Sequence, residues 1–273
     1  MHPDFDSVRT GERTLRYISR GEGTPAVIID QGAGLSIEAS SLRPILAGWP
    51  RVLRQIEKTT RVVMHDRAGL GWSSEPSRPR TSAEMVHDLR RVLQHARIAP
   101  PYVLVGHSIG GFNMRVFASE RPREIAGMVL VDSSHPEQWR RFAKILPPRS
   151  VRESAIIRRL RGWSEPTVSG ERIDFTMSAE QVRSTGPLED KPLVVLSHSP
   201  DTLRPPGLPA DLAGKLEGVW SELQRDLLGL SRRSTQVVAT HAGHHIQLDE
   251  PQLVVDAILK VLREARAAPR ALH

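Results

Sequence analysis

A serine flanked by glycines lies between a run of residues that predicts a strand and a run that predicts a helix. Residues 102–105 (Tyr-Val-Leu-Val) are apolar, as in a buried strand, and residues 112–118 have the character of a helix. Residues 106–110 between them are Gly-His-Ser-Ile-Gly, which leaves no room for a loop. A serine at such a turn is held in a strained backbone conformation that exposes its hydroxyl group. Ser108 is therefore the candidate nucleophile, and a merely tight structural turn is the alternative.

A serine hydroxyl becomes a useful nucleophile only with a base within hydrogen-bond reach and a carboxylate behind that base. Three histidines, His241, His244 and His245, follow the last predicted strand, residues 236–240. A histidine at the carboxyl end of a parallel strand lies where open α/β sheets bind their ligands. A metal site is the alternative, but no carboxylate or histidine pair at a fixed helical spacing supports it.

Two aspartates are candidates for the carboxylate. Asp132 follows the strand predicted at residues 127–131, and Asp201 follows the strand predicted at residues 192–197. Both lie between Ser108 and the histidines, in the order Ser, Asp, His that this chemistry uses on an α/β sheet. Either aspartate could instead cap a turn or a helix, so the residues alone leave the choice open.

A glycine-containing loop follows another predicted buried strand, residues 26–30 (Ala-Val-Ile-Ile-Asp). The loop, residues 31–34, is Gln-Gly-Ala-Gly, and glycines in such a place let backbone N–H groups approach a ligand closely. This loop is our candidate for half of an oxyanion hole. A tight turn would have the same sequence, and the two interpretations are compatible.

The elements that must position these residues alternate between strand and helix along the chain. After a hairpin at residues 6–19 come strands at 26–30, 61–66, 102–105 and 127–131. A capping box formed by Thr81 and Glu84 predicts the start of a helix before the third of these strands. This alternation requires a mostly parallel sheet covered by helices on both faces. It stops between residues 134 and 190, where prolines and glycines interrupt short helical pieces. We expect residues 134–190 to form a helical cap on a core made of residues 1–133 and 191–273.

Basic residues are concentrated in the first half of the predicted cap, where Glu153 is the acidic residue that opposes them. A solvated helical face is the plainer explanation, and selection of an acidic substrate or partner is the alternative. The basic residues are Arg140, Arg141, Lys144, Arg149, Arg152, Arg158, Arg159 and Arg161.

Composition limits the remaining possibilities. The 273 residues include no cysteine, which excludes disulfides, a thiolate nucleophile and a cysteine zinc site. The net charge of +7 comes mostly from scattered arginines without interleaved aromatic residues, so we expect no nucleic-acid partner. Residues 1–10 have no apolar signal region, and no apolar run is long enough to span a bilayer. We therefore expect a cytoplasmic protein without membrane insertion; the oligomeric state stays open.

Three motifs together resemble those of α/β-hydrolase fold serine hydrolases of the esterase-like kind with a cap insertion. They are residues 106–111 (Gly-His-Ser-Ile-Gly-Gly), 66–73 (Asp-Arg-Ala-Gly-Leu-Gly-Trp-Ser) and 243–251 (Gly-His-His-Ile-Gln-Leu-Asp-Glu-Pro). The similarity covers essentially the whole chain outside the predicted cap. It implies a mostly parallel eight-stranded sheet with helices on both faces.

The resemblance also implies roles for single residues. The family's base is the histidine directly after the glycine of the last motif, which is His244 here, with His245 as the fallback. The family most often places its acid where Asp201 lies. A subset that includes dehalogenase relatives places it one strand earlier, before a nearby proline, as in residues 132–136 (Asp-Ser-Ser-His-Pro). Because the loop after residue 197 lacks the usual glycine and is rich in proline, we prefer Asp132 to Asp201.

The oxyanion hole implied by the resemblance consists of two backbone N–H groups. One belongs to Ile109, the residue after the nucleophile, and the other to Ala33. Gln31 and Gly32 stand where the family has a His-Gly pair, which is a departure from its pattern.

The expected function is hydrolysis of a carboxylic ester, lactone or related acyl bond of a small molecule through an acyl-enzyme on Ser108. No metal or organic cofactor is expected. The serine argues against haloalkane dehalogenase and epoxide hydrolase chemistry, for which such relatives use an aspartate. An acyltransferase, a perhydrolase, a lyase and a non-catalytic small-molecule receptor on the same fold remain alternatives.

Overall fold

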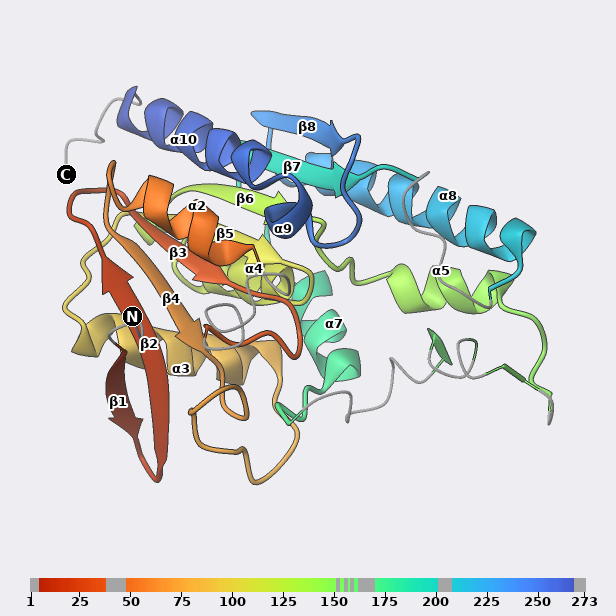
Figure 1. The fold of residues 1–273 in the computed structure, drawn as a ribbon, viewed down its shortest axis with the longest axis horizontal. Helices are drawn as coiled ribbons and strands as arrows, with labels where there is room; N and C mark the ends of the chain where they lie inside the picture. Colours follow the sequence, from red (N-terminus) through yellow and green to blue (C-terminus); the bar gives the residue numbers. More distant parts are fainter. Residues whose placement is uncertain are drawn as a thin grey trace.

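One eight-stranded sheet organises the part of the chain that the computed structural model describes, residues 5–37, 48–150, 153–154, 157, 160–161, 170–200 and 208–267. The strand order is β1-β2-β4-β3-β5-β6-β7-β8 (Figure 1). β1 and β2 form an antiparallel hairpin and β2 pairs antiparallel with β4, whereas all further pairs are parallel. The predicted mostly parallel sheet is therefore confirmed. The strands are β1 (Asp6–Thr10), β2 (Arg13–Arg20), β3 (Ala26–Asp30), β4 (Val62–Asp66), β5 (Tyr102–His107), β6 (Ile125–Val131), β7 (Leu193–His198) and β8 (Ser234–Ala239).

Helices cover both faces of the sheet, because successive strand residues point to opposite sides. In β5, Leu104 packs into one apolar cluster with α3, α4 and α7, whereas Val103 and Val105 join the cluster formed with α2 and α10. Figure 1 shows α2 and α10 on one side of the sheet and α3 on the other. The helices are α2 (Trp49–Ile56), α3 (Ser82–His95), α4 (Gly110–Glu120), α5 (Gln138–Ile145), α7 (Phe175–Arg183), α8 (Ala210–Asp226), α9 (Ile246–Asp249) and α10 (Pro251–Ala267), with 3₁₀ turns at Pro122–Glu124 and Leu227–Leu230.

The start of α3 is specified by its sequence. The Thr81 hydroxyl accepts the N–H of Glu84, and the Glu84 carboxylate accepts the N–H of Thr81. This reciprocal capping box confirms the one predicted from the sequence. The apolar stripe of α3, including Met85 and Leu89, is buried against the sheet.

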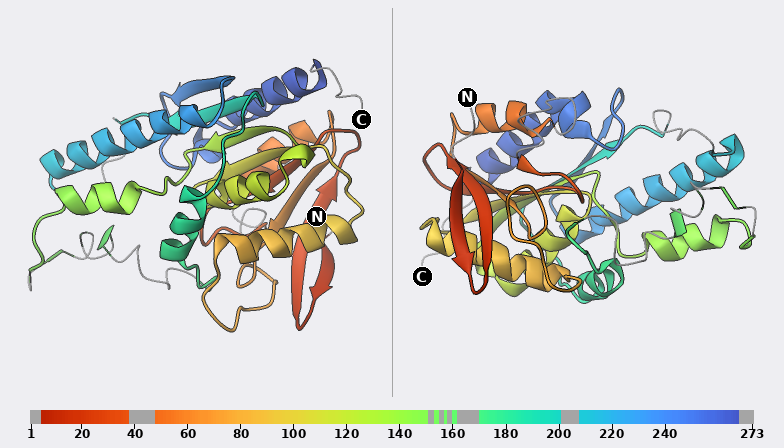
Figure 2. Two further views of the ribbon diagram at one scale, coloured as in Figure 1. Left: turned by 180° about the vertical axis from the view of Figure 1, so that it is seen from behind. Right: turned by 60° about the horizontal axis from the view of Figure 1, so that its bottom comes forward.

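The segment predicted as a cap contributes two helices to the described structure, and they pack differently. α5 lies beside α8, and the two extend together away from the sheet (Figures 1 and 2). α7 instead contacts α3 and α4, and its residues Phe175 and Val182 belong to the same apolar cluster as those helices. The boundary of the cap stays a prediction, although the structure already separates a projecting part from a part packed on the core.

Several basic residues of this segment are paired with carboxylates. Arg141 lies 2.6 Å from Asp226 on α8, and Arg161 lies 2.6 Å from Glu153. Arg152, Arg158 and Arg159 lie outside the described residues. The pairs that are described reduce the free positive charge that the sequence suggested.

None of the helices in the described ranges combines the length and the apolar character that crossing a bilayer requires.

Candidate active site

Ser108 lies at the sharp turn between β5 and α4, as its sequence context predicts. Its φ is +53°, in the left-handed region that non-glycine residues rarely adopt. The flanking glycines are required by close packing: a Cβ on Gly106 would lie 2.6 Å from the Cα of Gly111, and a Cβ on Gly110 would collide with the Asp30 carbonyl. The turn therefore has the strain and the glycines typical of a nucleophile elbow.

Asp132 and His244 are brought together at the carboxyl ends of β6 and β8. The Nδ1 of His244 lies 2.6 Å from the Oδ2 of Asp132, and the Asp132 side chain is fully buried. Asp132 also has a positive φ, +41°, so two strand-end residues of the site are held in a rare backbone conformation. Hydrogen bonding through Nδ1 fixes the ring of His244 and leaves Nε2 as its basic atom.

The other predicted acid and base have different positions. Asp201 lies outside the described residues. His245 packs its ring against His107 and His244, with centroids 5.4 Å away in each case. Burial, the first cause, and the neighbouring His244 lower the pKa of His245. Of His244 and His245, the one that forms a hydrogen bond with Asp132 among the described residues is His244.

His107 connects the turn that carries Ser108 to the loop that carries His244. Its Nε2 lies 2.9 Å from the backbone carbonyl of His244, so this nitrogen carries the proton and donates it. The ring centroids of His107 and His244 are 4.8 Å apart. Burial, followed by the two neighbouring histidines, holds the pKa of His107 well below its ordinary value. A neutral His107, the neighbour of Ser108 in the chain, therefore connects the Ser108 turn to the backbone of His244.

The loop after β3 packs against the turn that carries Ser108. A Cβ on Gly32 would lie 3.3 Å from the Cβ of Ser108 and 2.8 Å from the Nδ1 of His107, so glycine permits this close approach. The amide of Gly34 donates to Glu171 at 2.6 Å. The amides of Ala33 and Ile109 donate to no group among the described residues. These two amides are the pair predicted for the oxyanion hole.

Arg67, the second residue of the 66–73 motif, orients this loop. Its Nη2 donates to the Gly32 carbonyl at 3.0 Å, and its Nη1 donates to the Gln31 carbonyl at 2.6 Å. In a trans peptide the C=O of Gly32 and the N–H of Ala33 point in opposite directions. By holding the carbonyl, Arg67 turns the amide of Ala33 away from itself.

Arg67 is itself buried between two carboxylates. Its Nε lies 2.6 Å from Glu171, and its Nη1 donates to Asp30. Burial, the largest effect, would lower the pKa of Arg67, but Asp30 and Glu171 together raise it above its ordinary value. The Asp30 carboxylate also accepts from Asn113 on α4 at 2.7 Å.

A second histidine binds the predicted acid, and the sequence interpretation did not identify it. His198, the last residue of β7, places its Nδ1 2.7 Å from the Oδ2 of Asp132 and its Nε2 2.8 Å from Glu217 on α8. Trp220 donates its Nε1 to the Oδ1 of Asp132 at 3.0 Å. One signal was available: His198 ends the strand next to that of Asp132, so both side chains had to meet at the same sheet edge.

The hydrogen bonds around Asp132 shift its pKa and that of His198 in opposite directions. Burial alone would raise the pKa of Asp132, but its bonds to His198 and His244 hold it well below the usual range. Burial alone would lower the pKa of His198, but Asp132 and Glu217 outweigh burial and raise it to about 9. At neutral pH the site therefore contains an ionised Asp132 and a cationic His198.

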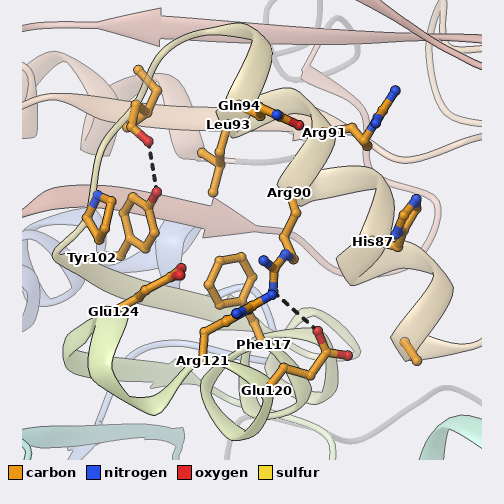
Figure 3. A pocket seen from close by; sticks show the side chains of 13 residues that line it. His87, Arg90, Arg91, Leu93, Gln94, Tyr102, Phe117, Glu120, Arg121 and Glu124 are labelled. Atoms are coloured by element: carbon orange, nitrogen blue, oxygen red, sulfur yellow. Dashed lines mark hydrogen bonds and ion pairs between the residues drawn. The ribbon is translucent and has the colours of Figure 1, made fainter.

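A surface hollow of about 680 Å³ lies elsewhere, between α3 and α4. Figure 3 shows Arg90 reaching across Phe117 towards Glu120, with which it forms an ion pair of 3.6 Å. The residues that line this hollow include none of the predicted site residues. Within the described ranges, no group of three or more histidine, aspartate or glutamate side chains is arranged to hold a metal ion.

Comparison with known proteins agrees with this fold. The sequence model of a family described as alpha/beta hydrolase fold matches residues 25–156. An uncharacterised Bacillus subtilis protein, YqjL, is 27% identical over 253 residues, which are 92% of this chain and 89% of that protein.

Solved structures extend the similarity to nearly the whole chain. A probable hydrolytic enzyme from Pseudomonas aeruginosa PAO1 superposes with a TM-score of 0.65 at 18% identity, covering 94% of this chain and 93% of that one. A thermophilic esterase from Thermogutta terrifontis does so with a TM-score of 0.64 at 19% identity, covering 96% and 99%. The chain thus has the α/β-hydrolase fold.

Proposed function

We propose that the protein is a serine hydrolase that cleaves a carboxylic ester, a lactone or a related acyl bond of a small molecule. The observation that carries the proposal is the 2.6 Å bond between Asp132 and His244 beside the strained turn of Ser108. In this proposal Ser108 is the nucleophile, His244 the base and Asp132 the acid that orients the base.

The proposed reaction passes through an acyl-enzyme. His244 takes the proton of Ser108 as the serine oxygen attacks the acyl carbonyl, and returns that proton to the leaving alcohol. A water molecule activated by the same histidine then releases the acid. Asp132 keeps His244 in the tautomer with the proton on Nδ1, so that Nε2 is available throughout.

The negative charge that develops on the carbonyl oxygen would be bound by the amides of Ile109 and Ala33. The Ile109 amide lies at the start of α4, whose positive end favours an anion. The Ala33 amide is supported by the contact of Arg67 with the neighbouring carbonyl. One donor of this kind typically lowers the barrier by about 3 kcal/mol.

We further propose that residues 134–190 act as the cap over a core of residues 1–133 and 191–273. Trp139 on α5 supports this, because it packs on Phe112 of α4 and on Phe175 of α7. Trp139 would then join α7 of the cap to the first turn of α4 in the core.

The test is intact-mass analysis after incubation with a fluorophosphonate, on the wild-type protein and on Ser108→Ala. A single adduct on the wild-type protein and none on the variant would establish an activated Ser108, and a panel of esters and lactones would follow. An unlabelled but folded wild-type protein would contradict the proposal and favour the receptor alternative.

A further inference from the structure

His198 has no role in the triad chemistry proposed above, yet it forms a hydrogen bond with the proposed acid, Asp132. Both of its ring nitrogens face carboxylate oxygens, those of Asp132 at 2.7 Å and of Glu217 at 2.8 Å. An ionised carboxylate can only accept hydrogen bonds, so each ring nitrogen must carry a proton. This geometry makes His198 an imidazolium cation between two anions.

The same carboxylate oxygen serves both histidines. Oδ2 of Asp132 accepts from His198 at 2.7 Å and from His244 at 2.6 Å. His198 also donates its backbone N–H to the Oδ1 of Asp132 at 3.2 Å. The orientation of Asp132, and with it the ring of His244, therefore depends on His198.

We propose that His198 is a cationic positioning residue, which fixes the carboxylate of Asp132 and makes His244 harder to protonate. The proposal rests on the proposed function, because it assigns His244 as the base. A positive charge on the far side of Asp132 opposes a second positive charge on His244. Glu217 limits this effect, because its negative charge balances that of His198.

Among the described residues, two carboxylates act on the charge of His198. Its pKa is raised by Asp132 at the end of β6 and by Glu217 on α8, against the lowering effect of burial. The Trp220 ring stacks on it, with centroids 6.1 Å apart and planes inclined at 23°. His244, after β8, faces it across Asp132. The side chain of His198 is only 3% exposed, so solvent screens these charges weakly.

The test compares three variants by the rate at which a fluorophosphonate labels Ser108 between pH 5 and pH 9. His198→Gln removes the cation while keeping an amide that can donate to Asp132. The acid limb of its profile of labelling rate against pH should move up by about one pH unit. Glu217→Gln removes the balancing anion, and its acid limb should move down by a smaller amount. Glu222→Gln removes a charge from an exposed position of the same helix and should leave the limb unmoved.

The directions of these shifts distinguish an electrostatic role from a structural one. A loss of packing or of a hydrogen bond would slow labelling at every pH without moving the limb. An unmoved limb in His198→Gln, or shifts of His198→Gln and Glu217→Gln in the same direction, would overturn the proposal.

A separate measurement keeps the inference independent of the proposed function. Imidazole ¹⁵N NMR of the full chain at pH 7 should show one histidine with both ring nitrogens protonated, and that signal should be lost in His198→Gln. If the wild-type protein is not labelled at Ser108, the proposed function fails while this signal still decides the state of His198. A neutral His198 ring at pH 7 would overturn the inference whatever the labelling shows.

Discussion

The two sides of Ser108 are supported by the same arrangement built from different cations. On the side of the Gly32 loop, Arg67 lies between Asp30 and Glu171. On the side of the base, His198 lies between Asp132 and Glu217. Arginine stays protonated at any pH at which a protein is folded, whereas histidine titrates. The comparison therefore predicts that the support of the proposed oxyanion loop is insensitive to pH and that the support of the proposed base, His244, depends on pH.

The largest expected effect comes from breaking the base side at its shared carboxylate. Asp132→Asn should lower kcat by about 10⁴-fold, because the amide no longer holds His244 in the required tautomer. Ester turnover measured with purified variants tests this. Asp201→Asn is the matched control and should change kcat little. The reverse result would move the acid to Asp201 and leave the fold unchanged.

Disrupting the support of the Gly32 loop should lower kcat by less than Asp132→Asn does. It should leave the pH dependence of kcat/KM unchanged. Arg67→Lys keeps the charge between Asp30 and Glu171 but loses the planar fork that also binds the Gln31 and Gly32 carbonyls. A loop displaced by about 1 Å would lower kcat by roughly 10²-fold. The pH profile of kcat/KM should keep its wild-type shape, and a shifted acid limb would contradict the comparison.

The sequence predicted the strand-end residues of both sides but not the outer carboxylates that support them. Ser108, the glycine loop and Asp132 each follow a predicted strand, and parallel strands bring their carboxyl ends to one edge. The roles of Glu171 and Glu217 could not be predicted in this way. Each lies far along the chain from the residue that it contacts, and no periodicity or turn signal indicates which helix face or loop meets the sheet edge.

His198 falls between these two cases. It directly follows the strand expected at residues 192–197, and the observed strand, Leu193–His198, ends one residue later and includes it. Its bonds to Asp132 and Glu217 depend on the packing of α8, which local sequence does not determine. The stripe of α8 that includes Leu216 and Leu223 predicts a helix but not its partner.

The charge on His198 should also appear in the stability of the protein. Its pKa is raised from 6.5 to about 9 on folding, so the folded state binds the proton more tightly than the unfolded state does. The resulting stabilisation is fully present below about pH 6.5 and is lost as the pH rises through 9. The free energy of unfolding should therefore fall over this window by on the order of 3 kcal/mol.

Urea unfolding at pH 6.5 and at pH 9 measures this difference. His198→Gln should be less stable than the wild-type protein at pH 6.5 and should lose most of the pH dependence. Arg67→Lys should retain the wild-type dependence, because its charge does not change in this range. A wild-type stability that is flat between these pH values would contradict a cationic His198.

The smallest effect, and the most direct comparison, comes from the outer carboxylate of each side. Glu171 binds the Nε of Arg67 with one oxygen and the amide of Gly34 with the other, each at 2.6 Å. Glu171→Gln has one acceptor oxygen for these two donors, so one bond is lost and the loop is held less firmly. We expect kcat to fall about 10-fold, the loss that about 1.4 kcal/mol of barrier produces.

The pH profile of kcat/KM shows whether the fall in kcat of Glu171→Gln comes from a displaced loop or from the lost charge. Glu171→Gln and Glu217→Gln make the same chemical change, one next to an arginine and the other next to a histidine. If the cations differ as proposed, Glu171→Gln should lower kcat/KM equally at every pH, whereas Glu217→Gln should displace its acid limb. A displaced limb in Glu171→Gln would mean that charge on the loop side also reaches His244. The two supports would then act on His244 together, because a charge next to Arg67 could alter the protonation of His244 only through the electric field inside the site.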